Sequence, residues 1–221
     1  MACVVDFKSP NGEWVGSYMS GGKQIVTRSY KLWHDVQYRC KIGGSYQESK
    51  PTYEGCTNYF VDYQSFTTWC QGQVGYMEID PCGRYWALDK DVLNGKSIIG
   101  YGPDNCCFIP IELNGLLQLQ VSRQNDLPLG VIKRNRKRSP FCAQVNIDGK
   151  NVYLGAYKTT ESAHKAWQIA KQLRICAMIS KYQKLVDKRV IDKLSLIAYN
   201  LEQDINLNKE TVNFGGVPLA A

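Results

Sequence analysis

Residues 130–182 carry the pattern that most constrains the fold, because three strand-like segments precede one long helical segment. The segments GVIKRN, FCAQVNID and NVYLGAYK favour strands, since β-branched and aromatic residues recur in them. Asp148-Gly149 joins the last two, and Asp-Gly favours a tight hairpin turn. An apolar stripe at helical spacing follows, made of Ala163, Ala166, Trp167, Ala170, Leu173 and Ala177. The pattern predicts a three-stranded antiparallel sheet packed on a helix.

Positive charge is concentrated in the same part of the chain. The protein carries a formal net charge of +7, but residues 128–190 hold 14 Lys and Arg against three Asp and Glu, a net +11. The flanking parts, 1–127 and 191–221, carry −2 each. This asymmetry indicates a polyanionic partner, either nucleic acid or an anionic surface, and a solvated basic face is the alternative.

A small sheet can present one face to a nucleic-acid groove while its other face packs on a helix. Basic side chains would then hold phosphates, and amide side chains and arginines would read base edges. The predicted DNA-contacting residues are Lys133, Arg134, Arg136, Lys137, Arg138, Gln144, Asn146, Asn151 and Tyr153. Leu154 and Trp167 are predicted core residues. RNA binding is a third hypothesis, which requires exposed stacking aromatics, and Tyr153 is the obvious candidate.

Several short motifs in this module follow a known pattern. They are Gly130-Val131, Ala143-Gln144-Val145, Tyr153-Leu154-Gly155-Ala156-Tyr157, Thr160-Glu161-Ser162-Ala163 and Ala166-Trp167. The stretch resembles the plant ethylene-response (Apetala-type) DNA-binding domain and its relatives in phage endonucleases. The resemblance implies binding of double-stranded DNA. Sequence preference does not carry over, because Ile132, Asn146 and Asn151 stand where the plant family usually has further arginines.

The second informative stretch places hard oxygen groups in a strand–turn–strand–helix pattern. Residues 85–92 and 98–110 favour strands, the Asn-Gly pair between them favours a tight turn, and a short helix can follow. Asp89 and Asp91 lie at i and i+2 on one side of the first strand, and Asn114 follows the second. Carboxylate and carbonyl oxygens bind magnesium, which can polarise a phosphate. A turn and a helix cap are the alternative interpretation.

The quoted motifs of the first half are YKLWHDVQYRC, PTYEGC, FTTWC, LDKDVL and YGPDNCCFIP, followed by Asn114. From Tyr30 to about Leu117 the chain resembles an HNH endonuclease family common in phages. The resemblance implies a ββα-metal fold, in which Asp89 and Asn114 bind a divalent metal, magnesium or else manganese. It also implies that Asn105 ties the hairpin together by side-chain hydrogen bonds. The predicted catalytic residues are Asp89, Lys90, Asp91 and Asn105.

Lys90 departs from the general HNH pattern. At this position the pattern has a histidine, which acts as the base for the attacking water. An ordinary lysine, with a pKa of about 10.4, is protonated at neutral pH and cannot accept a proton. Burial or a nearby metal would have to lower the pKa of Lys90, or Lys90 holds the scissile phosphate instead. His34 and His164 are the only histidines, and neither is the expected base.

Two helices and a loop are predicted in the first half. SYKLWHDVQYRCK favours a helix capped by Ser29, and VDYQSFTTWCQGQ favours one capped by Asp62. IGGSYQESKPTYEGC, between them, is predicted to be a loop. Near the other end of the chain, LVDKRVIDKLSLIAYNL favours a further amphipathic helix.

Cysteine usage indicates a reducing compartment. The number of cysteines, nine, is odd, and no export signal is visible, which argues against a set of disulfides. The sequence contains no Cys-x-x-Cys pair of the kind that binds zinc. Cys106 and Cys107 suit a strand with one side chain inside and one outside. No apolar run approaches the roughly 18 residues of a membrane helix. We expect a cytoplasmic protein, in the host cytoplasm if phage-encoded, without a membrane or an obligate protein partner.

These observations predict an α+β chain in four parts. They are an HNH-like nuclease domain with flanking helices at 1–118, a linker at 119–129, an Apetala-type DNA-binding domain at 130–182, and a helix and tail at 183–221. The predicted function is a metal-dependent DNA endonuclease of the homing or mobile-element type. A catalytically inactive DNA-binding or regulatory protein with a nuclease-like fold is the alternative.

Overall fold

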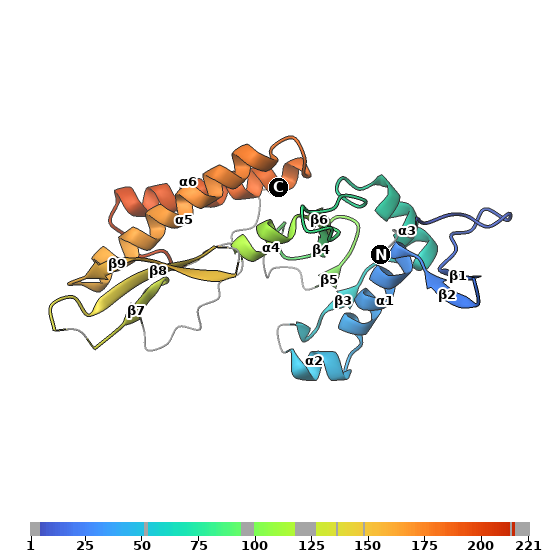
Figure 1. Cartoon of the computed structure of the whole chain (residues 1–221), viewed down its shortest axis with the longest axis horizontal. Helices are drawn as coiled ribbons and strands as arrows, with labels where there is room; N and C mark the ends of the chain where they lie inside the picture. Colours follow the sequence, from blue (N-terminus) through green and yellow to red (C-terminus); the bar gives the residue numbers. More distant parts are fainter. Residues whose placement is uncertain are drawn as a thin grey trace.

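The computed structural model describes residues 5–50, 53–93, 100–117, 127–135, 137–147, 149–212 and 214. Within these ranges the chain is a mixed α+β protein, as predicted. The molecule is elongated, with the first half of the chain at one end and a three-stranded sheet under two long helices at the other (Figure 1). Among the described residues, no helix combines the length and apolarity that crossing a bilayer requires.

The first half of the chain consists of short elements. They are β1 (Ser17–Ser20), β2 (Lys23–Val26), α1 (Arg28–Cys40), α2 (Ser45–Ser49), β3 (Thr57–Asn58) and α3 (Tyr63–Gly72). β1 and β2 form an antiparallel hairpin. The predicted helix beginning at Asp62 is confirmed, because Asp62 Oδ1 accepts a hydrogen bond from the Ser65 amide at 2.7 Å.

Two predictions in this half are wrong. Ser29 does not cap α1, since Thr27 occupies that position and the Ser29 amide and hydroxyl both donate to Asp6 Oδ1, at 3.1 and 2.8 Å. The stretch predicted as a loop contains α2, which follows directly on the turn at Gly43 and Gly44. A distant carboxylate and a five-residue helix are both too weakly encoded locally to be read from the sequence.

The next elements form a strand–strand–helix unit. β4 (Ala87–Asp89) pairs antiparallel with β6 (Cys107–Ile109), and α4 (Ile111–Leu117) follows. Between them β5 (Gly100–Tyr101) pairs in parallel with β3. The strands are shorter than predicted, because the chain turns at Asp89 and again at 102–106. The predicted Asn-Gly turn lies outside the described residues. Cys106 and Cys107 are both buried, which corrects the expectation that one faces outward.

The second half matches its prediction closely. β7 (Val131–Lys133), β8 (Phe141–Ile147) and β9 (Lys150–Tyr157) form an antiparallel sheet in the order β7-β8-β9, followed by α5 (Thr160–Tyr182) and α6 (Lys188–Asn206). α5 packs on the sheet, and α6 lies along α5 (Figure 1). Gly130 has a φ of +75° and lies so close to the Trp167 indole that a Cβ there would overlap the ring. Trp167 is a core residue, as predicted.

The buried stripe of α5 differs from the predicted one in its second half. Ala163 and Trp167 are buried, but Leu173 is 64% exposed and Ala177 is also exposed. The buried positions toward the end of the helix are Lys171, Ile175, Met178 and Tyr182. The prediction followed apolar residue types, whereas the contacts with α4 and α6 select this other face and bury a lysine in it.

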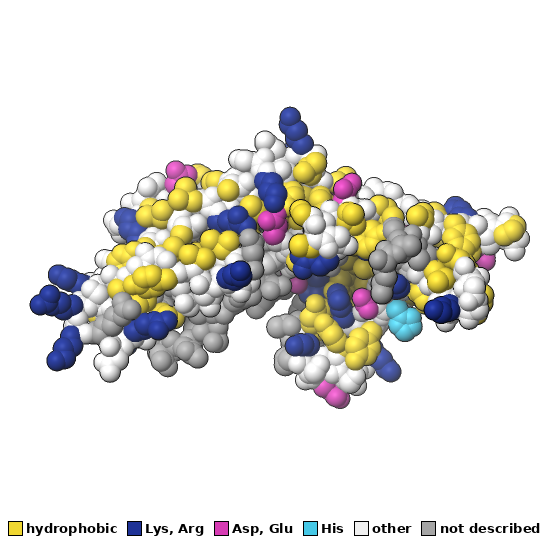
Figure 2. Space-filling view, viewed as in Figure 1, with side chains coloured by type: hydrophobic (Ala, Val, Ile, Leu, Met, Phe, Trp, Pro, Cys, Tyr) yellow, Lys and Arg dark blue, Asp and Glu magenta, His cyan; other side chains and the backbone are white. Residues whose placement is uncertain are grey.

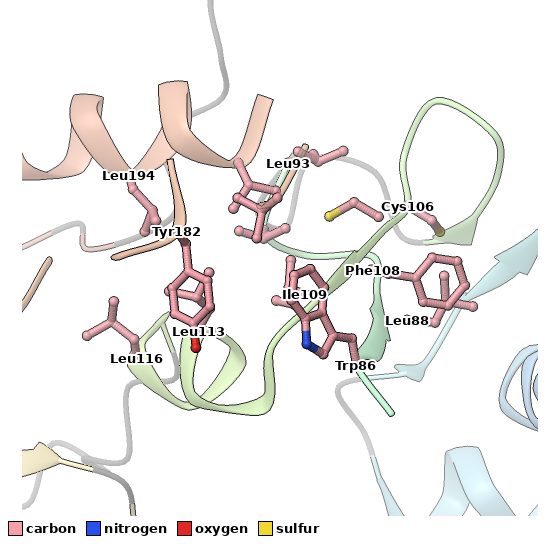
Figure 3. Close-up of a cluster of buried hydrophobic side chains, with 14 of the residues drawn as sticks. Trp86, Leu88, Leu93, Cys106, Phe108, Ile109, Leu113, Leu116, Tyr182 and Leu194 are labelled. Carbon is pink, nitrogen blue, oxygen red and sulfur yellow. The ribbon is translucent and has the colours of Figure 1, made fainter. Parts of the chain in front are cut away.

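One hydrophobic cluster runs through both halves of the molecule. It includes Leu113 and Leu116 of α4 together with Tyr182 of α5 and Leu194 of α6, which lie beside one another in Figure 3. At the edge of this cluster the Glu112 carboxylate accepts hydrogen bonds from the Lys181 ammonium and the Tyr182 hydroxyl. The end of α5 is therefore packed on the strand–strand–helix unit. The predicted boundaries at 118, 129 and 182 stay predictions, and most of the predicted linker lies outside the described residues.

Candidate metal centre and nucleic-acid interface

Asp89 is the last residue of β4 and is half-buried. Its Oδ1 accepts hydrogen bonds from the amides of Asp91, at 2.9 Å, and Val92, at 2.7 Å. Within the described ranges, Oδ2 accepts no hydrogen bond. Burial raises the pKa of Asp89 above its ordinary value, although the two backbone N–H groups oppose this shift. One carboxylate oxygen is thus held by the backbone, and the other keeps its lone pairs unused by the described residues.

Asn114 lies on α4 and is half-buried, and α4 packs against β4. The predicted metal ligands Asp89 and Asn114 therefore come from neighbouring elements of one unit. In the part of the chain that the structure describes, no three His, Cys, Asp or Glu side chains form a group that could hold a metal. One carboxylate and one amide oxygen, completed by water and phosphate oxygens, form a donor set that suits magnesium.

Lys90 is buried, with an exposed fraction of 5%. Its ammonium donates to Asp91 Oδ1 at 2.6 Å and lies 4.9 Å from the centre of the Tyr53 ring. Burial lowers the pKa of Lys90, but the hydrogen bond and charge of Asp91 more than offset it, so the pKa is raised overall. Burial therefore does not turn Lys90 into a base, because Asp91 keeps the ammonium protonated.

Asp91 and Asn105, the other predicted catalytic residues, have different surroundings. The Asp91 side chain is 57% exposed and forms the ion pair with Lys90. Asn105 lies in the turn before β6, where its amide donates to the Gly102 carbonyl at 3.2 Å. Its side chain makes no hydrogen bond with a described residue, so the predicted tie across the hairpin stays a prediction.

A second cation, Arg39, lies in the same cluster as Lys90. The sequence patterns predicted no role for it. Arg39 of α1 donates from Nη1 to the Tyr101 hydroxyl at 2.9 Å, and the Tyr101 and Tyr53 phenols are close enough for each to influence the pKa of the other. Among the described residues, no carboxylate forms a salt bridge with Arg39. A chain of contacts thus runs from Arg39 through two phenols to Lys90. Arg39 lies inside the YKLWHDVQYRC motif, but only the tertiary structure brings it to this place.

Neither histidine is placed beside Asp89 as a base. His164 is buried, its Nδ1 is 2.9 Å from the Leu129 carbonyl, and its Nε2 accepts from the Thr211 amide at 3.0 Å. These two contacts require the neutral tautomer with the proton on Nδ1. His34 lies on the exposed side of α1, next to Tyr30. His164 is therefore a structural residue.

The basic residues predicted to hold phosphates are exposed around β7 and the connection to β8. Lys133, Arg134, Lys137 and Arg138 are all exposed, and Arg136 lies outside the described residues. Lys and Arg side chains gather at the end of the molecule that carries the three-stranded sheet (Figure 2). Such a concentration of unburied charge attracts a polyanion over the range that salt screening allows.

The predicted base-reading residues lie on the sheet face opposite α5. Gln144 pairs with Tyr153, and Asn146 pairs with Asn151 across β8 and β9, while Ala143 and Val145 pack on the helix side. Tyr153 is 56% exposed. Asn146 has a structural task, since its Oδ1 accepts from the Gly149 amide at 3.0 Å and its Nδ2 donates to Asn151 Oδ1 at 3.2 Å. Gln144 and Tyr153 are the stronger candidates for contact with a base.

The comparisons add no relative to these observations. A comparison with protein-family models, with curated proteins and with solved structures finds no match to this chain.

Proposed function

We propose that the chain is a metal-dependent endonuclease that hydrolyses phosphodiester bonds in double-stranded DNA, of the homing or mobile-element type. The strand–strand–helix unit would cut, and the basic sheet would hold the substrate. The observation that carries this proposal is Asp89 at the end of β4, beside a helix that carries Asn114. Two amides fix one of its carboxylate oxygens, and no described residue donates a hydrogen bond to the other.

In this proposal Asp89 and Asn114 hold a divalent metal, magnesium or manganese. The metal would supply polarisation of the phosphate and stabilisation of the leaving oxygen. Lys90 holds a phosphate oxygen rather than accepting a proton, since its pKa is raised and its ammonium already pairs with Asp91.

The basic sheet is proposed to supply most of the affinity for DNA. Its exposed lysines and arginines would contact phosphates, which fixes position without reading sequence. Gln144 and Tyr153, on the outer face of β8 and β9, would contact base edges. A cytoplasmic location, without a membrane or an obligate protein partner, stays a prediction.

A nicking assay on supercoiled plasmid and phage DNA tests the proposal. The purified protein is incubated with magnesium, with manganese, or with a chelator, and the fractions of nicked and linear DNA are measured. We expect cutting that requires the metal and is lost in Asp89→Ala. Glu202→Ala, which removes an exposed carboxylate from α6, is the matched control and should cut like the parent protein.

A catalytically silent DNA-binding protein is the second candidate. It is favoured by the absence of a histidine at the site and by the raised pKa of Lys90. It predicts tight, salt-sensitive DNA binding without metal-dependent cutting of any tested DNA. Cutting that persists in Asp89→Ala would instead point to a contaminating nuclease or to another site.

A further inference from the structure

Two cysteines meet beside the Lys90 cluster. Cys40 is the last residue of α1, and Cys56 lies in the turn before β3, 16 residues later. Their sulfur atoms are 3.5 Å apart. Cys40 is half-buried, whereas Cys56 is 1% exposed. Among the cysteines that the structure describes, Cys40 and Cys56 form the pair whose sulfur atoms are in direct contact.

The surroundings favour reaction between these two thiols. A disulfide has an S–S bond of about 2.05 Å, so the sulfurs need to approach by about 1.5 Å. Cys40 lies at a helix end, and Cys56 follows Gly55, which has a φ of +72°, so neither is held inside a long regular element. The hydrogen bond between the two thiols raises the pKa of Cys40 and lowers the pKa of Cys56, and the positive charge of Lys90 lowers both, so Cys56 is the sulfur that the pair favours as a thiolate.

We infer that Cys40 and Cys56 are a redox modification site that a hydroperoxide converts into a reversible disulfide. The Cys56 thiolate attacks the outer peroxide oxygen, the O–O bond breaks, and the leaving oxygen takes a proton to become an alcohol, or water if the oxidant is hydrogen peroxide. Cys56 is then a sulfenic acid. The Cys40 sulfur attacks the Cys56 sulfur, and hydroxide leaves as water with the Cys40 proton. Two thiols are oxidised by two electrons, and one peroxide is reduced.

This inference does not rest on the proposed nuclease activity. Its structural consequence lies beside the proposed site, because the disulfide would close the segment that carries α2 and Tyr53. The Tyr53 ring contacts the Lys90 ammonium, and Arg39 directly precedes Cys40. Oxidation would therefore restrain Tyr53, which contacts Lys90, and the end of α1, which carries Arg39.

Mass spectrometry of the full chain tests the inference. Cys82→Ser and Cys176→Ser together remove two exposed thiols and limit links between molecules. In this background seven of the nine cysteines remain. After hydrogen peroxide we expect a mass loss of about 2 Da, two fewer alkylatable thiols, a peptide that links Cys40 to Cys56, and reversal by dithiothreitol.

Single variants separate the two steps. In Cys40→Ser we expect the reaction to stop at a sulfenic acid on Cys56, seen as a gain of about 16 Da that dimedone traps. In Cys56→Ser the linked peptide and the thiol loss should both disappear. The inference is overturned if peptide mapping of the parent background finds Cys40 joined to another cysteine, or finds both thiols free after peroxide has fully oxidised added glutathione.

Discussion

In the strand–strand–helix unit the charged groups are few and enclosed, whereas on the three-stranded sheet they are many and exposed. Asp89 is half-buried with one oxygen held by two amides, and Lys90 is buried against Asp91 and Tyr53. By contrast, Lys133 and Arg138 stand in solvent. Both regions are polar, but only the first holds its charged atoms at fixed distances.

Enclosed and exposed charges differ in how strongly a single substitution affects function. Enclosed charges feel little screening, so one substitution there changes a specific step by a large factor. Exposed charges act through a screened field, and their effects are small individually and roughly additive.

Replacing Asp89 by Asn removes the charge and keeps the shape. We expect the nicking rate with magnesium to fall by about 10³-fold or more, because metal-ion stabilisation is worth several kcal/mol. DNA affinity should stay within a factor of about three, since fewer phosphate contacts are involved than on the sheet. Nicking rates and fluorescence anisotropy measure the two effects. Equal losses of cutting and binding would contradict the separation of roles.

The same variant has a stability signature whose sign is fixed by the raised pKa of Asp89. Because the fold disfavours the ionised carboxylate, the penalty is present above its folded pKa and disappears as the pH falls through that pKa. Asp89→Asn should therefore be at least as stable as the parent at neutral pH. Thermal melts should show this advantage fading toward acid pH. A variant that is less stable at neutral pH would show that the two amide hydrogen bonds dominate.

Replacing Lys133, Arg134 and Arg138 together by Ala tests the exposed region. We expect the slope of log affinity against log salt to become shallower by about one unit for each phosphate that the variant no longer binds. The nicking rate at saturating DNA should change little. The control replaces Lys23, Lys184 and Lys209, three exposed cations outside β7, β8 and β9, by Ala. If the slope falls equally in both triple variants, binding follows net charge and not this face.

Replacing Glu112 by Gln tests the junction between the two regions. Burial raises the pKa of Glu112, but the hydrogen bonds from Lys181 and Tyr182 lower it by a larger amount, so the net shift is downward. Its contribution to stability is therefore present above the ordinary pKa of 4.5 and is lost as the pH falls through the lower folded value. We expect Glu112→Gln to cost about 1–2 kcal/mol near neutral pH.

Urea unfolding at pH 7 and pH 3 measures this effect. The difference between Glu112→Gln and the parent should shrink at the lower pH, because protonation of Glu112 removes the charge that distinguishes the two side chains. Glu202→Gln on the exposed side of α6 is the matched control and should be neutral at both values. A constant difference at both pH values would mean that packing, not the charge, accounts for the change.

Replacing Lys171 by Met probes the buried lysine of the shared core. Lys171 is 4% exposed, and its ammonium donates to the Leu116 carbonyl at 2.5 Å. Burial lowers its pKa from 10.5 to about 8, so protonation destabilises the fold and stability rises as the pH increases from below 8 to above 10.5. The parent should therefore gain stability over this window, and Lys171→Met should not.

We expect the free energy of unfolding of Lys171→Met, relative to the parent, to be higher near pH 7 and lower near pH 10. The change between the two values should be on the order of 1–3 kcal/mol. At the higher pH the variant lacks the hydrogen bond to Leu116 and gains nothing from the removed charge. Urea unfolding at the two pH values measures this change, and parallel stability curves would show that folding does not lower the pKa of Lys171.

Some errors of the sequence predictions share one cause. Leu173 was predicted to be buried and is exposed, while Lys171 was not in the apolar stripe and is buried. Ser29 was predicted as a helix cap, but it bonds to Asp6, 23 residues away. In both cases the partner comes from another part of the chain, so no local pattern contains the information.

Periodicity, turn residues and capping are local signals, so the amino-acid sequence predicted the elements of the basic module, its exposed charges and the capped helix at Asp62. It predicted Asp89 inside a strand at 85–92, whereas in the structure β4 ends at Asp89. No local signal predicts that Arg39, Tyr53 and Lys90 form one cluster, or that α5 joins both regions. Those outcomes depend on which surfaces pack together, and packing selects among contacts between residues far apart in the chain.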